Sequence, residues 1–450
     1  MKRILISLSA GLALGLSGMA QAESLLEVYQ LALQNDAQYR AAEYQYQASQ
    51  QDRPLARSAL LPQIVAQGGL TESSSETKGH SNPAFNGKDD WRTLNGALNL
   101  NLSLYHHDQW MALKQADASV AEAEARYKAA QQDLILRVAE AYFNVLGAED
   151  NLRFATAEKE AIARQLEQSQ KRFEVGLIAI TDVKESQASY DAAVAAEINA
   201  RNQVDIAREA LSVITKRYID RLAPLSDELP LVTPQPDNIQ AWVEQALAQN
   251  LDFLAAQFAA KAAGYEVKKA RAGHYPYLDL VASYSYSDLN YNDNGTLFSG
   301  DREKTDTNLG VQLTFPLYTG GAVSAKTSKA AASYSQALEN LEFVRRQTVQ
   351  AARSSYLNVK AGISQVQAFR RALESTRTAA EATQAGFEVG TRTAVDVLLS
   401  LRSTFQADRD YAKARYNYIL DYLRLKRAAG TLTEQDLRVV DDLLVKDPAA

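Results

Sequence analysis

The chain has 450 residues, a formal net charge of −6 and no cysteine. The lack of cysteine excludes a disulfide framework and a thiol nucleophile. The acidic charge argues against sequence-independent binding of nucleic acid, which needs clustered basic residues to replace phosphate counterions. Mean hydropathy is −0.30, and the mature sequence has no apolar run long enough for a transmembrane helix, which disfavours an inner-membrane protein.

The first 22 residues have the pattern of a secretory signal peptide. Lys2-Arg3 forms a basic start, residues 4–16 form an apolar core, and Ala20-Gln21-Ala22 is a cleavage signal before Glu23. The apolar run is shorter than the about 18 to 20 residues of a retained transmembrane helix. We therefore expect residues 1–22 to be removed from an exported chain.

Short motifs recur at one fixed offset along the mature chain. Three pairs are 214 residues apart, namely Pro62 and Pro276, Tyr142 and Tyr356, and the Phe-Glu-Val-Gly motifs that begin at Phe173 and Phe387. The mature chain has 428 residues, which is twice this offset. One offset kept through strand-like and helix-like stretches predicts two structurally equivalent repeats, residues 23–236 and 237–450.

Two proline-free stretches, residues 84–223 and 317–447, predict long helices. Residues 107–175 are rich in strong helix formers, and their apolar positions have the spacing of a coiled-coil seam. At about 1.5 Å per residue this helix would be roughly 100 Å long, too long for a compact domain.

Glycines predict where these helices turn. Gly176 ends the first helix, with Phe173 packing near the turn, and a second helix starts at about Thr181 or Asp182, which are good N-cap types. The second repeat shows the same order around Gly390. We expect one long helical hairpin per repeat, at about 107–217 and 322–429, with a C-terminal tail after the second.

Period-two alternation predicts strands. Apolar residues alternate with polar or small ones over 94–104 and 309–315, and two further segments, 64–70 and 278–287, pair with them. Polar connections at 71–90 and 288–307 predict loops. We expect one strand hairpin per repeat, at about 62–105 and 276–318, with strands of about the 9 to 11 residues that cross an outer membrane.

Four such strands do not close a membrane barrel, because barrels need at least about eight strands and an open edge in lipid leaves backbone groups unpaired. Identical subunits must therefore share one barrel. A dimer gives eight strands and a trimer twelve, and the strand pattern leaves both open.

Four motifs are specific in combination: residues 172–177 with Thr181-Asp182-Val183, residues 315–321, residues 389–397 and residues 414–418. In these motifs the chain resembles the TolC family of outer-membrane export channels over nearly its whole mature length. The resemblance implies a mainly α fold with a membrane β-barrel, in which a homotrimer forms a twelve-stranded barrel, four strands per chain, continuous with a periplasmic cylinder of long antiparallel helices.

The resemblance also implies a location and a function. The protein would lie in the outer membrane of a Gram-negative bacterium, among outer-membrane lipid, and reach into the periplasm. It would be the exit duct for type I protein secretion, multidrug efflux or both. Its implied partners are a periplasmic adaptor (membrane fusion protein) and an inner-membrane ABC or proton-driven transporter, with adaptor contact at the turns, at Gly176, Leu177, Gly390 and Thr391.

The sequence gives no support for catalysis. Its four histidines show no metal-ligand pattern, and no phosphate-binding glycine loop or nucleophile elbow is present. We expect no enzyme activity, no cofactor and no resident metal, so a partner must supply energy.

The two turns differ at one position. Arg392 stands where the first repeat has Ile178, and this divergence suggests a dedicated role. The resemblance implies that Arg392 ties one hairpin to Thr181-Asp182 of the neighbouring hairpin and keeps the entrance shut. Phe387 stands where the best-known family member has a tyrosine of this network, so that hydrogen bond is lost here.

A second departure concerns the constriction. The best-known member has two aspartate rings, whereas here Asp396 is followed three residues later by Leu399. Three Asp396 carboxylates would repel one another and attract blocking cations, while a Leu399 ring would narrow the pore by dewetting. We expect weaker block by multivalent cations than in a two-ring channel.

Two other protein classes also contain long helices and strands. A periplasmic adaptor would bury the apolar strand face in a water-soluble core. A trimeric coiled-coil surface adhesin would not need two helical hairpins per chain. Solubility without detergent would indicate the adaptor, and absence of ion conductance would indicate the adhesin.

Overall fold

A computed structural model describes residues 22–83, 86–291 and 301–445. The expected signal peptide lies outside the described residues except for Ala22, as do part of the loop expected at 288–307 and the end of the C-terminal tail. The described chain forms two compact units, and each takes segments from both halves of the sequence. The first unit contains residues 22–40, 130–248 and 350–445, and the second contains 41–129 and 249–349. The boundary between sequence repeats at residue 236 stays a prediction.

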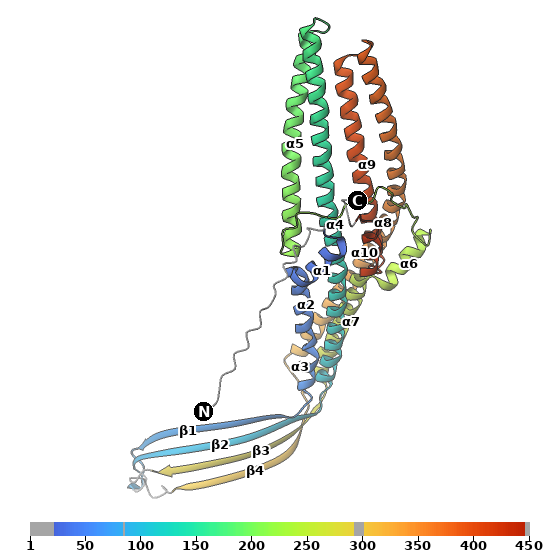
Figure 1. The fold of residues 1–450 in the computed structure, drawn as a ribbon. Coiled ribbons are helices and arrows are strands. Elements are labelled where there is room, and N and C mark those ends of the chain that lie inside the picture. The colour runs from blue at the N-terminus through green and yellow to red at the C-terminus, as the bar shows by residue number, and fades with distance from the viewer. Residues whose placement is uncertain (1–21, 84–85, 292–300, 446–450) are drawn as a thin grey trace, which may run out of the picture. The chain divides into compact units, whose positions relative to one another are not determined.

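The second unit contains one antiparallel sheet of four strands (Figure 1). In chain order and in hydrogen-bonded order these are β1 (Gln63–Thr77), β2 (Gly87–Tyr105), β3 (Tyr277–Tyr291) and β4 (Arg302–Thr314). The strands extend well into the segments expected as loops, because the ladder continues to the pair Thr77 and Gly87. The reason is that these segments contain no proline before Pro83, so nothing in their backbone interrupts the pairing.

The sheet has one apolar and one polar face. Paired residues share a face, and Leu98 pairs with Ala66 on β1 and Tyr284 on β3, while Asn99 pairs with Val65 and Ser283. The apolar face is open to solvent in the single chain. Several of its large side chains are about half or more exposed, namely Ile64, Leu94, Leu98, Leu309, Val311 and Leu313.

Both outer strands of the sheet keep a free edge. β1 pairs only with β2 and β4 only with β3 among the described strands. An edge strand presents a row of N–H and C=O groups that pair with another strand. One chain therefore forms an open sheet.

Short helices accompany the sheet in the second unit. These are most of α2 (Ala37–Gln50), α3 (Asp52–Ser58), α7 (Leu251–Arg271) and the short 3-10 helix η2 (Ala272–His274). The ion pair of Arg53 with Asp117, 2.7 Å between Nε and Oδ1, joins α3 to α4 (His107–Glu174).

Two long helical hairpins dominate the first unit. The first is α4 with α5 (Ile180–Thr215), and the second is α8 (Ala322–Glu388) with α9 (Ala394–Ala428). α4 and α8 are continuous and run through both units. Within the described ranges, no helix is long and apolar enough to cross a membrane.

The core of the first unit lies where these helices meet three shorter ones, α1 (Leu25–Asn35), α6 (Ile239–Gln249) and α10 (Glu434–Asp441). Its largest fully buried side chains come from α1, α4, α5, α9 and α10, and include Leu25, Leu134, Tyr142, Phe143, Leu211, Leu423 and Leu437. The Tyr142 hydroxyl donates to the carbonyl of Ala223 at 2.7 Å. The packing thus holds the middle of α4 against α1, α5, α9 and α10 in the first unit.

Candidate gate at the helical turns

The first turn connects α4 to α5. Gly176 has a positive φ of 76°, its N–H donates to the carbonyl of Phe173 at 2.9 Å, and the N–H of Leu177 donates to the carbonyl of Arg172 at 2.9 Å. These two bonds form a Schellman motif, which satisfies the last carbonyls of α4 and needs glycine at the left-handed position. Phe173 does not pack at this turn, because it is 41% exposed.

The start of α5 differs from the sequence prediction. The N-cap is Ala179, with no side-chain hydrogen bond, so the expected cap at Thr181 or Asp182 is wrong. The reason is that α5 begins at Ile180, which places both residues inside its first turn. A carboxylate is still favoured there by the positive end of the helix dipole. In the described chain the Asp182 side chain has no hydrogen bond or ion pair.

The second turn repeats the same motif. Gly390 has a φ of 80°, its N–H donates to the carbonyl of Phe387, and the N–H of Thr391 donates to the carbonyl of Gly386 at 2.8 Å. The four residues expected to contact an adaptor are exposed: Gly176, Leu177, Gly390 and Thr391.

The start of α9 is capped from both directions. The Thr393 hydroxyl accepts the N–H of Asp396 at 3.2 Å, and the Asp396 carboxylate accepts the N–H of Thr393 at 2.9 Å. This capping box satisfies two backbone donors. The bonds from the Thr393 backbone and hydroxyl hold the pKa of Asp396 below its usual range, and the charge of Arg392 lowers it further. Asp396 is therefore ionised at neutral pH. Leu399, one turn further along α9, is 58% exposed.

Arg392 folds back over the end of α8. The backbone N–H of Arg392 donates to the carbonyl of Gly386 at 3.2 Å. A Cβ atom on Gly386 would lie 2.8 Å from Cγ of Arg392, so only glycine leaves room for this side chain. No hydrogen bond or ion pair joins Arg392 to Thr181 or Asp182 in the described part of one chain, and the tie between neighbouring hairpins stays a prediction.

Phe387 lies in the opposite environment to its sequence counterpart Phe173. Phe387 is 2% exposed and packs with Ala394, Val397 and Leu401 of α9. The guanidinium of Arg172 lies over its ring, 4.2 Å from the centroid, and donates to its carbonyl at 3.0 Å. This contact was not predicted from the sequence, although Arg172 belongs to one of the four specific motifs.

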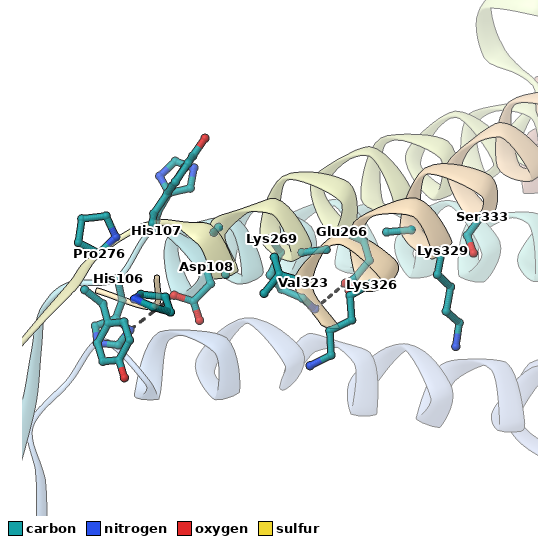
Figure 2. Close-up of a pocket in the computed structure, with 17 residues that line it drawn as sticks. His106, His107, Asp108, Glu266, Lys269, Pro276, Val323, Lys326, Lys329 and Ser333 are labelled. Atoms are coloured by element: carbon teal, nitrogen blue, oxygen red, sulfur yellow. Dashed lines mark ion pairs between the residues drawn. The ribbon is translucent and has the colours of Figure 1, made fainter. Parts of the chain in front are cut away.

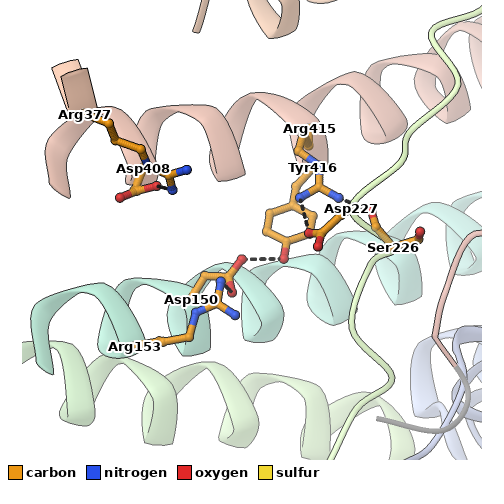
Figure 3. A network of polar contacts seen from close by, with 8 residues as sticks. All are labelled: Asp150, Arg153, Ser226, Asp227, Arg377, Asp408, Arg415 and Tyr416. Carbon is orange, nitrogen blue, oxygen red and sulfur yellow. Dashed lines mark hydrogen bonds and ion pairs between the residues drawn. The ribbon is translucent and has the colours of Figure 1, made fainter. Parts of the chain in front are cut away.

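A row of polar contacts joins α9 to α4 along the first unit. From the core outward, the contacts are Arg427 with Asp133 (2.7 Å), Arg424 with Glu140 (2.8 Å), Tyr416 with Asp150 (2.7 Å) and Arg409 with Glu158 (3.0 Å). Figure 3 shows Tyr416 and Asp150 pointing toward each other between the two helices, with Arg415 directed toward Ser226 and Asp227 of the connecting segment. These contacts hold the second hairpin against the first.

The second unit contains a separate cavity of about 810 Å³ (Figure 2). It lies where the strands meet the helices, beside Lys269, Lys326 and Lys329. Nε2 of His106 at its edge is 3.0 Å from the Asp279 carboxylate. Lys269 is paired with Glu266 at 2.5 Å, so part of the positive charge is neutralised.

The chain has two similar helical hairpins and an open four-stranded sheet with an exposed apolar face, which are the features expected of an outer-membrane channel protein. The chain belongs to the outer membrane efflux protein family. The sequence profile of this family matches residues 28–215 and 242–431. These two matches fall in the two halves of the sequence.

Individual relatives agree with this assignment. The chain is 40% identical to Outer membrane protein TolC of Vibrio cholerae, over 97% of this chain and 98% of the relative. It is 31% identical to Alkaline protease secretion protein AprF of Pseudomonas aeruginosa, over 98% and 91%. The solved CmeC outer membrane channel of Campylobacter jejuni has the same fold, with a TM-score of 0.78, 16% identity and coverage of 94% of this chain and 90% of that one.

The fold class and the outer-membrane location expected from the sequence are thus confirmed. The protein is an outer-membrane efflux or secretion channel, and its function is transport and not catalysis. The adaptor and adhesin alternatives lose their support, because family membership covers both halves of the chain.

Proposed function

We propose that three copies of the chain form one exit duct that is closed at the helical turns and opens when a partner docks. The observation that carries this proposal is the open sheet, which has two free edges and an exposed apolar face. Three sheets joined edge to edge give twelve strands, with the apolar face toward lipid and the polar face toward a water-filled interior. The two repeats, 23–236 and 237–450, then alternate around the duct.

The gate consists of Arg392, Thr181, Asp182, Asp396, Leu399 and Phe387. Asp182 and Arg392 carry opposite charges on different hairpins, and neither side chain has a hydrogen bond or ion pair within the described chain. This arrangement supports a tie between neighbouring protomers. Asp396 supplies an acidic ring and Leu399 an apolar ring at the constriction.

Partner docking supplies the energy of opening. Solvent-exposed ion pairs contribute about 0 to 1 kcal/mol each, so three Arg392 ties hold the closed state by a few kcal/mol. Moving an equilibrium from 1:99 to 99:1 takes about 5.5 kcal/mol of differential binding. A periplasmic adaptor that binds Gly176, Leu177, Gly390 and Thr391 supplies it, and an ABC or proton-driven transporter supplies the substrate.

The names of relatives indicate the cargo. The family is named for efflux, and its relative AprF is named for the secretion of an alkaline protease. The proposed duct therefore serves type I protein secretion, multidrug efflux or both.

Conductance in planar bilayers tests the gate. Arg392→Ser should raise the resting conductance of the purified protein, since it removes the tie to Asp182. Arg402→Ser is the matched control, because Arg402 is an exposed arginine of α9, the helix that follows Arg392, and has no ion pair in the described chain. If the Arg392→Ser protein and the unchanged protein have the same conductance, Arg392 does not contribute to the gate.

A further inference from the structure

Arg172 makes three favourable interactions with the end of the other hairpin. Its guanidinium lies 4.2 Å from the centroid of the Phe387 ring, which is the geometry of a cation–π interaction. It donates to the Phe387 carbonyl at 3.0 Å. It also places a cation at the C-terminal turn of α8, where a positive charge is favoured. α8 has no basic residue of its own in its last turn, whereas α4 has Lys171 and Arg172.

The contact joins the two hairpins of one chain. Arg172 belongs to α4, and Phe387 is fixed in the second hairpin by burial against Ala394 and Val397 of α9. Further from the turns, Leu398 of α9 packs with Ile162 and Ala193 of the first hairpin, and Arg409 pairs with Glu158. Of these contacts between the two hairpins, the Arg172–Phe387 contact therefore lies nearest to the turns.

The internal duplication explains why the described part of the chain shows this contact at one turn and not at the other. The 214-residue offset places Arg172 opposite Gly386, and Ile178 opposite Arg392. Each hairpin thus has one arginine near its turn, but at different equivalent positions. Gly386 lacks the side chain that would collide with the stem of Arg392. The divergence gives one arginine to a contact within the chain and leaves the other for a contact outside it.

We infer that the Arg172–Phe387 contact is a second closed-state tie, which acts inside each protomer and must break when the channel opens. This inference rests on the proposed gate and adds a positioning residue to it. The Arg392 tie resists separation of neighbouring protomers. The Arg172–Phe387 contact resists movement of α8 and α9 away from α4 and α5 of the same chain. Opening then requires the second hairpin to leave the first, and not only a tilt of whole protomers.

A double-mutant cycle measures this contact through the resting conductance of the full-length protein in planar bilayers. Arg172→Gln removes the cation, and Phe387→Leu removes the ring but keeps an apolar side chain. We expect each to raise the ratio of open to closed channels about tenfold, which corresponds to about 1.4 kcal/mol. The double variant should equal the larger single effect, because both changes break one contact. Effects that multiply in the double variant would overturn the inference.

Two matched variants separate the contact from loss of packing or of charge. Phe387→Tyr keeps the ring and should keep the low conductance. Arg164→Gln removes an exposed arginine from the same helix, with no partner in the described chain, and should leave conductance unchanged. A leak in Phe387→Tyr as large as that in Phe387→Leu would show that the ring face does not hold Arg172.

The Arg392→Ser variant distinguishes failure of this inference from failure of the proposed gate. If Arg392→Ser conducts and the Arg172 and Phe387 variants do not, the contact is not a tie and the gate stands. If no variant conducts, the proposed gate fails. Hydrogen exchange then tests separately whether the Arg172–Phe387 contact holds residues 384–392 in place. Amides of residues 384–392 should exchange at least about threefold faster in Arg172→Gln than in Arg164→Gln, and equal rates would refute the contact.

Discussion

Asp396 and Asp182 occupy equivalent positions in the duplication but have different surroundings. The N-cap residue before Asp396 is Thr393, which engages its carboxylate, whereas the N-cap before Asp182 is Ala179, which has no side chain to do so. Asp182 therefore keeps its carboxylate for another partner. The difference between Ala179 and Thr393 at the N-cap thus leaves Asp182 available for a tie, whereas Asp396 caps its helix.

We expect Leu399 to determine how strongly the proposed constriction binds cations. Leu399→Asp should tighten block by a trivalent lanthanide ion at least about tenfold, because it adds one carboxylate per chain next to the ionised Asp396, and each unit charge contributes about 1 kcal/mol at 4 Å even in bulk water. The measurement is a conductance titration with the ion. The Leu399→Asn protein, whose new side chain has a similar size and no charge, should be blocked as weakly as the unchanged protein. Equal block of both variants would contradict a ring of residue 399 at the constriction.

At the scale of elements, the sheet and the helices differ in how far their sequence defines them. The alternation of Leu98 and Asn99 defines which residues share a face of the sheet, since strand side chains alternate strictly. It does not define where the strands end. The ladder between β1 and β2 extends to Thr77 because backbone pairing depends little on whether the side chains are apolar.

The two faces of β2 should tolerate charge very differently. Leu98→Arg places a guanidinium on the apolar face and should cost about 2 to 4 kcal/mol near the bilayer midplane. Asn99→Arg, the neighbouring position on the polar face, should cost little. The measurement is the fraction of each variant recovered folded in the outer membrane. Equal recovery would show that the apolar face does not contact lipid.

Helix boundaries illustrate a second limit. Gly176 and Gly390 mark both turns correctly, because a Schellman motif needs a left-handed residue and glycine adopts this conformation at little cost. The start of α5 could not be read from the sequence in the same way. Thr181 and Asp182 are strong N-cap types, but the helix starts before them at Ile180. The rigid turn at Gly176 fixes where the chain re-enters a helix, and this geometry outweighs residue preference.

At the scale of the whole molecule, the open sheet requires more than one chain. Free edges on β1 and β4 would leave unpaired backbone groups in lipid, each costing several kcal/mol. The strand count alone allows eight or twelve strands. The water-filled interior that an export duct needs favours twelve, since eight strands are filled by side chains.

Crosslinking tests the stoichiometry. Detergent-extracted protein treated with a short amine-reactive reagent should give bands of one, two and three chains and nothing larger. The same reaction after denaturation should give single chains, which controls for random collision. A series that ends at two chains would indicate an eight-stranded barrel and would contradict the proposed trimer.

The sequence alone determined the duplication, the two hairpins, the four strands and the alternation of their faces. These features repeat at fixed spacing, and local backbone geometry converts spacing into structure. The tertiary structure decided which equivalent residues differ in role: Phe387 is buried while Phe173 is exposed, and Arg172 reaches across to the other hairpin. Two repeats with the same local pattern make different contacts once they pack against each other, because packing distances depend on residues far apart in the chain.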